Sequence, residues 1–165
     1  MTNETQPAPS PSLVKPVLAL EPLSSEQVNV IWPQLEPAIK ASLPPTEVSD
    51  DPGAMNNVLA AVMKGELQVW IATKRGEGTC YVYGGVVTKM TSPAISAVKS
   101  LWIYSLFINE LPPAPLVGTI IETLREFARQ NGCKTIFAIT NNLVIEKLVK
   151  HLAGTTDYRL VRLEV

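Results

Sequence analysis

Four consecutive segments decide the fold: residues 101–108 (LWIYSLFI), 109–115 (NELPPAP), 116–132 (LVGTIIETLREFARQNG) and 135–140 (TIFAIT). The first and last are short apolar runs typical of buried strands, and the third has apolar residues at helical spacing. Two buried strands joined by one helix run parallel, because only a crossover connection returns the chain in the same direction. Ligands of such units bind at the carboxyl ends of the strands, beside the first turn of the helix. The loop at residues 109–115 is therefore where a functional site is expected.

Length and composition indicate one globular domain. The chain has 165 residues, and 46% of them are hydrophobic, which is enough for a sizeable core. Residues 1–13 are rich in Pro, Ser, Thr and Gln and have little to bury, so we predict a flexible leader there. Residues 14–165 form the single domain of this prediction.

Charge and hydropathy exclude several classes of function. The net charge is -1 and the pI about 5.9, without the basic surface that nucleic-acid binding needs. No apolar run approaches the roughly 18 residues of a membrane span, and the N-terminus lacks a secretory signal, so an intracellular protein is expected. Cys80 and Cys133 lie far apart without metal-ligand spacing. They are predicted to be reduced, buried thiols, and no metal site is expected.

Strand signals precede the central unit. Residues 14–20 (VKPVLAL) alternate enough for a first strand, and residues 67–73 and 80–89 predict an antiparallel hairpin around the turn KRGEGT. The pair Gly84-Gly85 inside the second hairpin strand predicts a β-bulge or a close backbone approach.

Helix signals complete the chain. Ser24 and Gln27 have the spacing of a capping box at the start of a first helix. Asp51, which precedes a proline, is predicted to be the N-cap of a second helix. A last helix is expected over residues 143–152, and residues 158–165 (YRLVRLEV) alternate as a final strand.

This order of elements predicts a mixed α/β sheet of six to seven strands. Its first half is antiparallel, its second half is the parallel strand–helix–strand unit, and helices cover both faces. No internal repeat is visible in the sequence.

The element order, together with residues 120–142 (IIETLREFARQNGCKTIFAITNN), resembles the GNAT acyltransferase superfamily. The resemblance spans about Val14 to Val165 and rests on element order and helix position. It implies that the fourth strand, the next loop and the third helix would bind acetyl-CoA. In the family, a Q/R-x-x-G-x-G/A motif holds the pyrophosphate with its backbone N–H groups at the start of this helix.

This chain departs from that motif. Pro112, Pro115 and Val117 occupy the positions of its basic residue and two glycines, and Gly118 comes one position late. Pro112, Pro113 and Pro115 also remove backbone N–H donors from the segment that would hold phosphate. We therefore expect no cofactor, with acetyl-CoA as the alternative. If a cofactor binds, the resemblance assigns it these residues: Phe107, Ile108, Leu116, Val117, Gly118, Thr119 and Asn142.

Three residues are candidates for acid–base catalysis. The tyrosine that many family members use as general acid is Val149 here, and His151 lies two residues further on. Glu110 is the carboxylate that follows the fourth strand, and Tyr104 is a polar residue within it. Each also has a structural explanation: a histidine at a helix end, a solvated loop carboxylate, and a buried phenol with a hydrogen-bond partner.

Two functional hypotheses follow. The first is a GNAT-like protein that has lost acyl-CoA chemistry and acts as a structural or interaction protein, since a fold does not by itself carry a function. Residues 30–43 (VIWPQLEPAIKASL) and 64–73 (KGELQVWIAT) resemble GNAT-like proteins of tailed phages, which implies virion or assembly partners, homo-oligomers, and a location in the host cytoplasm or the virion. The alternative is an acetyl-CoA-dependent N-acyltransferase with an atypical cofactor loop. Neither nucleic acid nor a membrane is expected as a partner.

Overall fold

The computed structural model describes residues 16–44, 51–76, 78–92, 98–140, 146–147, 150 and 154–156. Its elements are, in order, β1 (Val17–Pro22), α1 (Ser25–Ala41), α2 (Ala54–Met63), β2 (Leu67–Gly76), β3 (Thr79–Thr91), β4 (Ser100–Ile108), α3 (Ala114–Gln130) and β5 (Thr135–Ala138). The predicted leader, Asn142, His151 and the predicted final strand lie outside the described residues.

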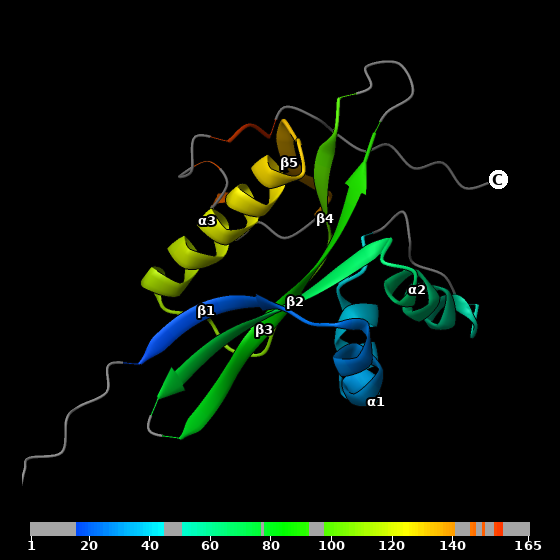
Figure 1. Ribbon diagram of the computed structural model, residues 1–165, viewed down its shortest axis with the longest axis horizontal. Helices are drawn as coiled ribbons and strands as arrows, with labels where there is room; N and C mark the ends of the chain where they lie inside the picture. The colour runs from blue at the N-terminus through cyan, green and yellow to red at the C-terminus, as the bar shows by residue number, and fades with distance from the viewer. Residues whose placement is uncertain are drawn as a thin grey trace, which may run out of the picture.

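The sheet has the mixed topology that the sequence predicts (Figure 1). Its described strands lie in the order β1-β2-β3-β4-β5; neighbouring pairs from β1 to β4 are antiparallel, and β4 and β5 are parallel. The helix α3 connects the two parallel strands, which confirms the predicted crossover.

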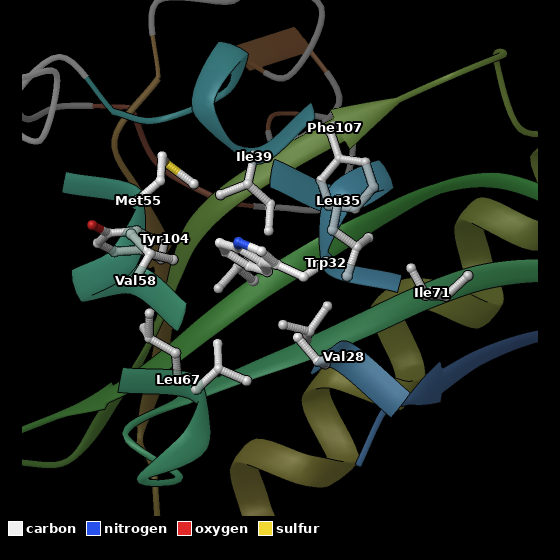
Figure 2. Packing of buried hydrophobic residues seen from close by; sticks show 13 residues of the cluster. Val28, Trp32, Leu35, Ile39, Met55, Val58, Leu67, Ile71, Tyr104 and Phe107 are labelled. Carbon is white, nitrogen blue, oxygen red and sulfur yellow. The ribbon is translucent and has the colours of Figure 1, made fainter. Parts of the chain in front are cut away.

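Helices cover both faces of the sheet, as predicted (Figure 1). On one face, α1 and α2 pack on β2, β3 and β4 around a core that Figure 2 shows from close by. The buried members of this first core are Val28, Trp32, Leu35, Ile39, Met55, Val58, Val62, Leu67, Val69, Ile71, Val87, Tyr104 and Phe107. On the other face, α3 packs over a second core of Leu20, Trp70, Ala72, Val86, Leu101, Leu116, Leu124, Ala128 and Cys133.

The helix starts are decided by local hydrogen bonds. Ser24 and Gln27 form the predicted capping box, with each side chain accepting from the backbone N–H of the other. The prediction for Asp51 is wrong: α2 begins two residues later, with Gly53 as N-cap. Asp51 Oδ1 instead accepts from the Gly53 N–H at 2.8 Å, which makes a turn before the helix.

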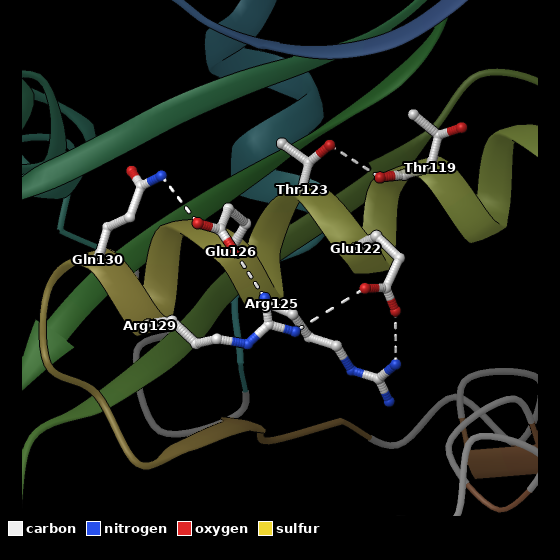
Figure 3. A network of polar contacts seen from close by, with 7 residues as sticks. All are labelled: Thr119, Glu122, Thr123, Arg125, Glu126, Arg129 and Gln130. Carbon is white, nitrogen blue, oxygen red and sulfur yellow. Dashed lines mark hydrogen bonds and ion pairs between the residues drawn. The ribbon is translucent and has the colours of Figure 1, made fainter.

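The exposed side of α3 carries ion pairs (Figure 3). Arg125 contacts Glu122 at 2.7 Å, and Arg129 contacts Glu126 at 2.5 Å. Gln130 Nε2 also donates to Glu126, and this hydrogen bond, followed by the one from Arg129, lowers the pKa of that carboxyl. Such exposed pairs contribute little stability, so the burial of the opposite face holds the helix in place.

Both long central strands contain a β-bulge. Gly84 pairs with Ala72 but Val82 pairs with Thr73, so Tyr83 is an extra residue in β3. This confirms the irregularity predicted from the Gly84-Gly85 pair. A second bulge lies between β3 and β4, because Val87 pairs with Ser105 while Thr88 pairs with Ile103, which leaves Tyr104 as the extra residue.

The two cysteines differ in their surroundings. Both are free, and Cys133 is buried as expected. The prediction for Cys80 is wrong, because its place at the start of β3, next to the hairpin turn, leaves it exposed. None of the helices in the described part of the chain is long and apolar enough to cross a membrane.

Candidate functional site

The parallel strands β4 and β5 stay together over a short distance only. Their pairs run from Ser100↔Thr135 to Ile103↔Ala138, where β5 ends, while β4 continues to Ile108. Within the described residues, β5 pairs with no residue from Ser105 to Ile108, so this half of β4 is bonded to β3 alone. A strand edge of this kind offers backbone N–H and C=O groups to another extended, amide-bearing molecule.

The bulge in β4 lies at the point where the two strands part. Side chains normally alternate between the faces of a sheet, yet Tyr104 and Ser105 both face α1 and α2. Tyr104 belongs to the core on that face, and the Ser105 hydroxyl lies 2.6 Å from the hydroxyl of Ser42, the C-cap residue of α1. The bulge therefore brings two adjacent hydroxyl side chains to one face of the strand.

A cavity of about 310 Å³ opens beside Tyr104 on this face. Two carboxylate residues, Asp51 and Glu66, and one ammonium residue, Lys89, line it together with Tyr104. The remaining lining residues are Leu43, Ala54, Asn57, Val58, Ala61 and Leu67. A small polar molecule that carries positive charge suits this lining.

One buried donor, near the point where β4 and β5 separate, has no acceptor among the described residues. Trp102 Nε1 is buried and makes no hydrogen bond among the residues that the structure describes. Trp102 pairs with Phe137 in the ladder, one residue before the last β4–β5 pair, and its ring lies 5.2 Å from the ring of Tyr104. A buried donor without a partner costs about 1–3 kcal/mol, which makes Trp102 Nε1 a candidate contact for a ligand.

The loop before α3 uses most of its own backbone donors. The N–H groups of Asn109 and Glu110 both donate to the carbonyl oxygen of Tyr83, at 2.8 and 3.3 Å. At the helix start, the N–H groups of Leu116 and Val117 both donate to the carbonyl oxygen of Pro113, at 2.8 and 3.2 Å. Few donors remain for a ligand at this end of the site.

Glu110 lines a second cavity, of about 510 Å³, together with Tyr83, which packs against the second core. Its carboxylate accepts a hydrogen bond from the phenol of Tyr81, and this hydrogen bond is the main reason why the pKa of Tyr81 is raised. The rings of Tyr81 and Tyr83 meet edge to face, 4.8 Å apart. The other lining residues are Pro16, Lys74, Gly76 and Thr79.

The structure separates the two described catalytic candidates. Tyr104 is buried and lines the smaller cavity, whereas Glu110 is exposed and lines the larger one. His151, the third candidate, lies outside the described residues. Sequence reasoning did not single out the unsatisfied Trp102 Nε1 or the phenol of Tyr81, because the hydrogen-bond partners of a side chain depend on tertiary contacts.

The residues predicted to bind a cofactor, if there is one, fall into two groups. The side chains of Phe107 and Leu116 are buried, the first in the core under α1 and α2 and the second in the core under α3. Ile108 and Gly118 are exposed, and Thr119 is half-buried with its hydroxyl donating to the Pro115 carbonyl. The half-buried Val117 completes the described part of this set, and Asn142 lies outside it.

In the described part of the chain no group of three potential ligands could hold a metal ion.

No protein-family model matches this chain, and no curated protein matches it. Solved structures do. A probable acetyltransferase superposes with a TM-score of 0.64 and 12% identity, over 88% of this chain and 97% of the other. The ribosomal-protein-alanine N-acetyltransferase of Brucella melitensis biovar Abortus 2308 gives a TM-score of 0.61 and 11% identity, over 88% and 99%. The aminoglycoside N-acetyltransferase AAC(6′)-Iy, in complex with the bisubstrate analog CoA-S-monomethyl-acetylneamine, gives 0.62 and 12%, over 90% and 98%.

These structures correct one expectation from the sequence. The absence of a cofactor was predicted from the proline-rich loop, but AAC(6′)-Iy has this fold and binds a CoA-derived analog, and it was also solved with CoA. The prediction of no cofactor is therefore contradicted. A loop that is poor in N–H donors still leaves the strand edge beside it. At these identities the likeness establishes the fold and not the reaction. The chain has the mixed α/β fold of the GNAT acetyltransferases.

Proposed function

We propose that this protein is an acetyl-CoA-dependent N-acyltransferase. The observation that carries the proposal is the parting of β4 from β5 after the pair Ile103↔Ala138. In the described part of the chain it leaves a strand edge next to a bulge, a cavity and a buried donor without a partner. The fold shared with CoA-binding acetyltransferases supports the same function.

The β4 edge suits the arm of the acyl donor. Acetyl-CoA would supply a thioester at the end of a pantetheine arm that contains two amides. Amides pair with a strand edge as a further strand does, so the backbone of residues 105–108 would hold this arm. The indole N–H of Trp102 lies near the start of this edge and would donate to a polar group of the bound donor.

The cavity beside Tyr104 suits an amine acceptor. The carboxylates of Asp51 and Glu66 favour a positively charged molecule there, and Lys89 would orient it by repulsion. In the transfer, the bound ammonium group would first release a proton to solvent, because only the neutral amine has the lone pair that attacks the thioester carbonyl. The C–S bond would break, the new amide nitrogen would release its second proton to solvent, and the departing thiolate would take up a proton from an acid that solvent later reprotonates. We assign this proton to the Tyr104 phenol, because Tyr104 lies at the parting of the strands.

The earlier hypothesis of lost acyl-CoA chemistry rests on the loop at residues 109–115 and on Val149, which occupies the position of the family's tyrosine. The comparisons favour the alternative, since the neighbours named above are acetyltransferases. No observation in the described residues supports a phage origin or a virion partner, and neither is part of this proposal.

Calorimetric titration with acetyl-CoA and with desulfo-CoA tests the proposal. We expect saturable binding of both, and thermal stabilisation of about 2.7 kcal/mol at a ligand concentration near one hundred times Kd. For a chain of this length, that corresponds to roughly 2–4 °C in Tm for each kcal/mol. A melting temperature that does not move at millimolar acetyl-CoA would overturn the proposed function.

A further inference from the structure

We propose that the protein recognises its acyl donor through the pantetheine arm and not through the nucleotide. Acyl-pantetheine thioesters without the 3′-phospho-ADP group would then bind nearly as well as acetyl-CoA. This inference rests on the proposed function, and it concerns the class of donor that the site accepts. Thioesters of a single phosphopantetheine fall in the same class.

The first reason is the supply of backbone donors. From Asn109 to Val117, three residues are prolines without an N–H group, and the N–H groups of four others are already bonded to the Tyr83 and Pro113 carbonyls. Among the described residues, this leaves the N–H groups of Leu111 and Ala114 without a hydrogen bond. A pyrophosphate is normally held by several N–H groups of one turn, and here its cradle would have two, separated by two prolines.

The second reason is charge. No lysine or arginine occurs from residue 109 to residue 124, and the first basic side chain on α3, Arg125, is paired with Glu122. Glu110 places a carboxylate in the loop itself. A nucleotide with three phosphates would meet this negative charge, with Lys74 as the cation that shares a cavity with Glu110.

The opposite end of the site keeps its binding groups. The β4 edge from Ser105 to Ile108 has no β5 partner in the described chain, and the Trp102 indole has no acceptor there. Both lie where the arm and the thioester would bind. Recognition is therefore concentrated on the part of the donor that acetyl-pantetheine and acetyl-CoA share.

The test compares affinities by calorimetry on the full chain, using acetyl-CoA, acetyl-pantetheine and 3′-phospho-ADP. We expect the Kd of acetyl-pantetheine to lie within about tenfold of that of acetyl-CoA, equivalent to about 1.4 kcal/mol. We also expect 3′-phospho-ADP at millimolar concentration not to displace acetyl-pantetheine. A larger preference for acetyl-CoA, or displacement by 3′-phospho-ADP, overturns this inference and leaves the proposed function intact. If neither thioester binds, both proposals fail.

Two variants test the residues involved. Pro115→Ala restores an N–H group in the first turn of α3 and should tighten acetyl-CoA severalfold without changing the Kd of acetyl-pantetheine. Pro37→Ala, an exposed proline in α1, is the matched control and should change neither. Lys74→Gln should also leave both affinities unchanged. A loss of acetyl-CoA affinity in Lys74→Gln, or no gain in Pro115→Ala, contradicts the inference.

Discussion

The phenol of Tyr81 in β3 donates a hydrogen bond to the carboxylate of Glu110, in the loop that follows β4. The same loop is bonded to β3 a second time, because the N–H groups of Asn109 and Glu110 donate to the Tyr83 carbonyl. One side-chain and two backbone hydrogen bonds therefore attach the loop at residues 109–113 to the strand next to β4. The carboxylate that sequence reasoning considered as a general base is a partner of Tyr81.

The pKa of Tyr81 should depend on Glu110. The pKa is raised above its usual value of 10, first by the hydrogen bond to Glu110 and then by the cost of removing the phenolate from water. In spectrophotometric titration, the tyrosinate signal lost in Tyr81→Phe should have its midpoint above pH 10. In Glu110→Gln this midpoint should move down, because the negative charge is gone. An unchanged midpoint would show that Glu110 does not face Tyr81 in solution.

The raised pKa of Tyr81 also predicts how the stability of the fold changes with pH. A group whose pKa is higher in the folded than in the unfolded chain stabilises the fold below the unfolded value and loses this contribution as the pH rises further. The wild type should therefore lose stability above pH 10 more steeply than Tyr81→Phe. Denaturant unfolding between pH 8 and pH 11 measures the difference, with Tyr83→Phe as the control variant.

Gly85 should not tolerate a side chain. A Cβ atom there would lie 2.6 Å from the Trp70 carbonyl oxygen and would overlap with the Phe107 ring. Since both neighbours are packed in the sheet and its cores, we expect Gly85→Ala to cost about 1–3 kcal/mol in urea unfolding. Gly118→Ala is the matched control: it lies in a helix facing open space, and should stabilise by about 0.5–1 kcal/mol. Equal effects of the two substitutions would contradict this packing.

Trp70 and Trp102 should respond differently to the same substitution. Trp70 Nε1 donates to Thr88 Oγ1 at 2.9 Å, whereas Trp102 Nε1 has no partner in the described chain. Trp70→Phe deprives Thr88 of a donor, while Trp102→Phe removes an unsatisfied group. We expect Trp70→Phe to be more destabilising by about 1–3 kcal/mol in thermal and urea unfolding.

Because Trp102 is proposed to contact the acyl donor, acetyl-CoA affinity should also distinguish the two tryptophan variants. Trp102→Phe should weaken acetyl-CoA binding by about two- to tenfold, the value of one neutral hydrogen bond. Trp70→Phe should leave the binding of properly folded protein unchanged, because its indole N–H faces Thr88. Identical affinities of the Trp102→Phe variant and the wild type would exclude the indole from the donor site.

Tyr104→Phe should slow acyl transfer without weakening substrate binding. A positioned acid typically contributes at least about a hundredfold, so kcat should fall by about this factor while KM changes little. Release of free thiol from acetyl-CoA can be followed in the presence of an amine acceptor. Tyr83→Phe, at the bulge in β3, is the matched control. Unchanged kcat in Tyr104→Phe, together with a loss in Glu110→Gln, would transfer the role to Glu110.

Local sequence signals were sufficient for most of the fold. The capping box of Ser24 and Gln27 involves residues three apart, and the strand–helix–strand unit follows from apolar spacing within residues 101–140. The Gly84-Gly85 pair marked the irregularity in β3, since glycine tolerates both a bulge and a close approach. The start of α2 was predicted too early, because Asp51 can either cap a helix or form the preceding turn, and the two choices have the same local sequence.

The sequence by itself determined the order of elements and the parallel pairing of β4 with β5, because both follow from the spacing of apolar residues. It also determined the shortage of N–H donors in residues 109–115, because proline has no N–H group. Only the tertiary structure decided where β4 leaves β5, that Tyr104 is the bulged residue, and that Glu110 pairs with Tyr81. These features depend on contacts between segments far apart in the chain, whose geometry is set by how the two cores pack against the sheet. For that reason the proline-rich loop, taken alone, led to the wrong expectation about the cofactor.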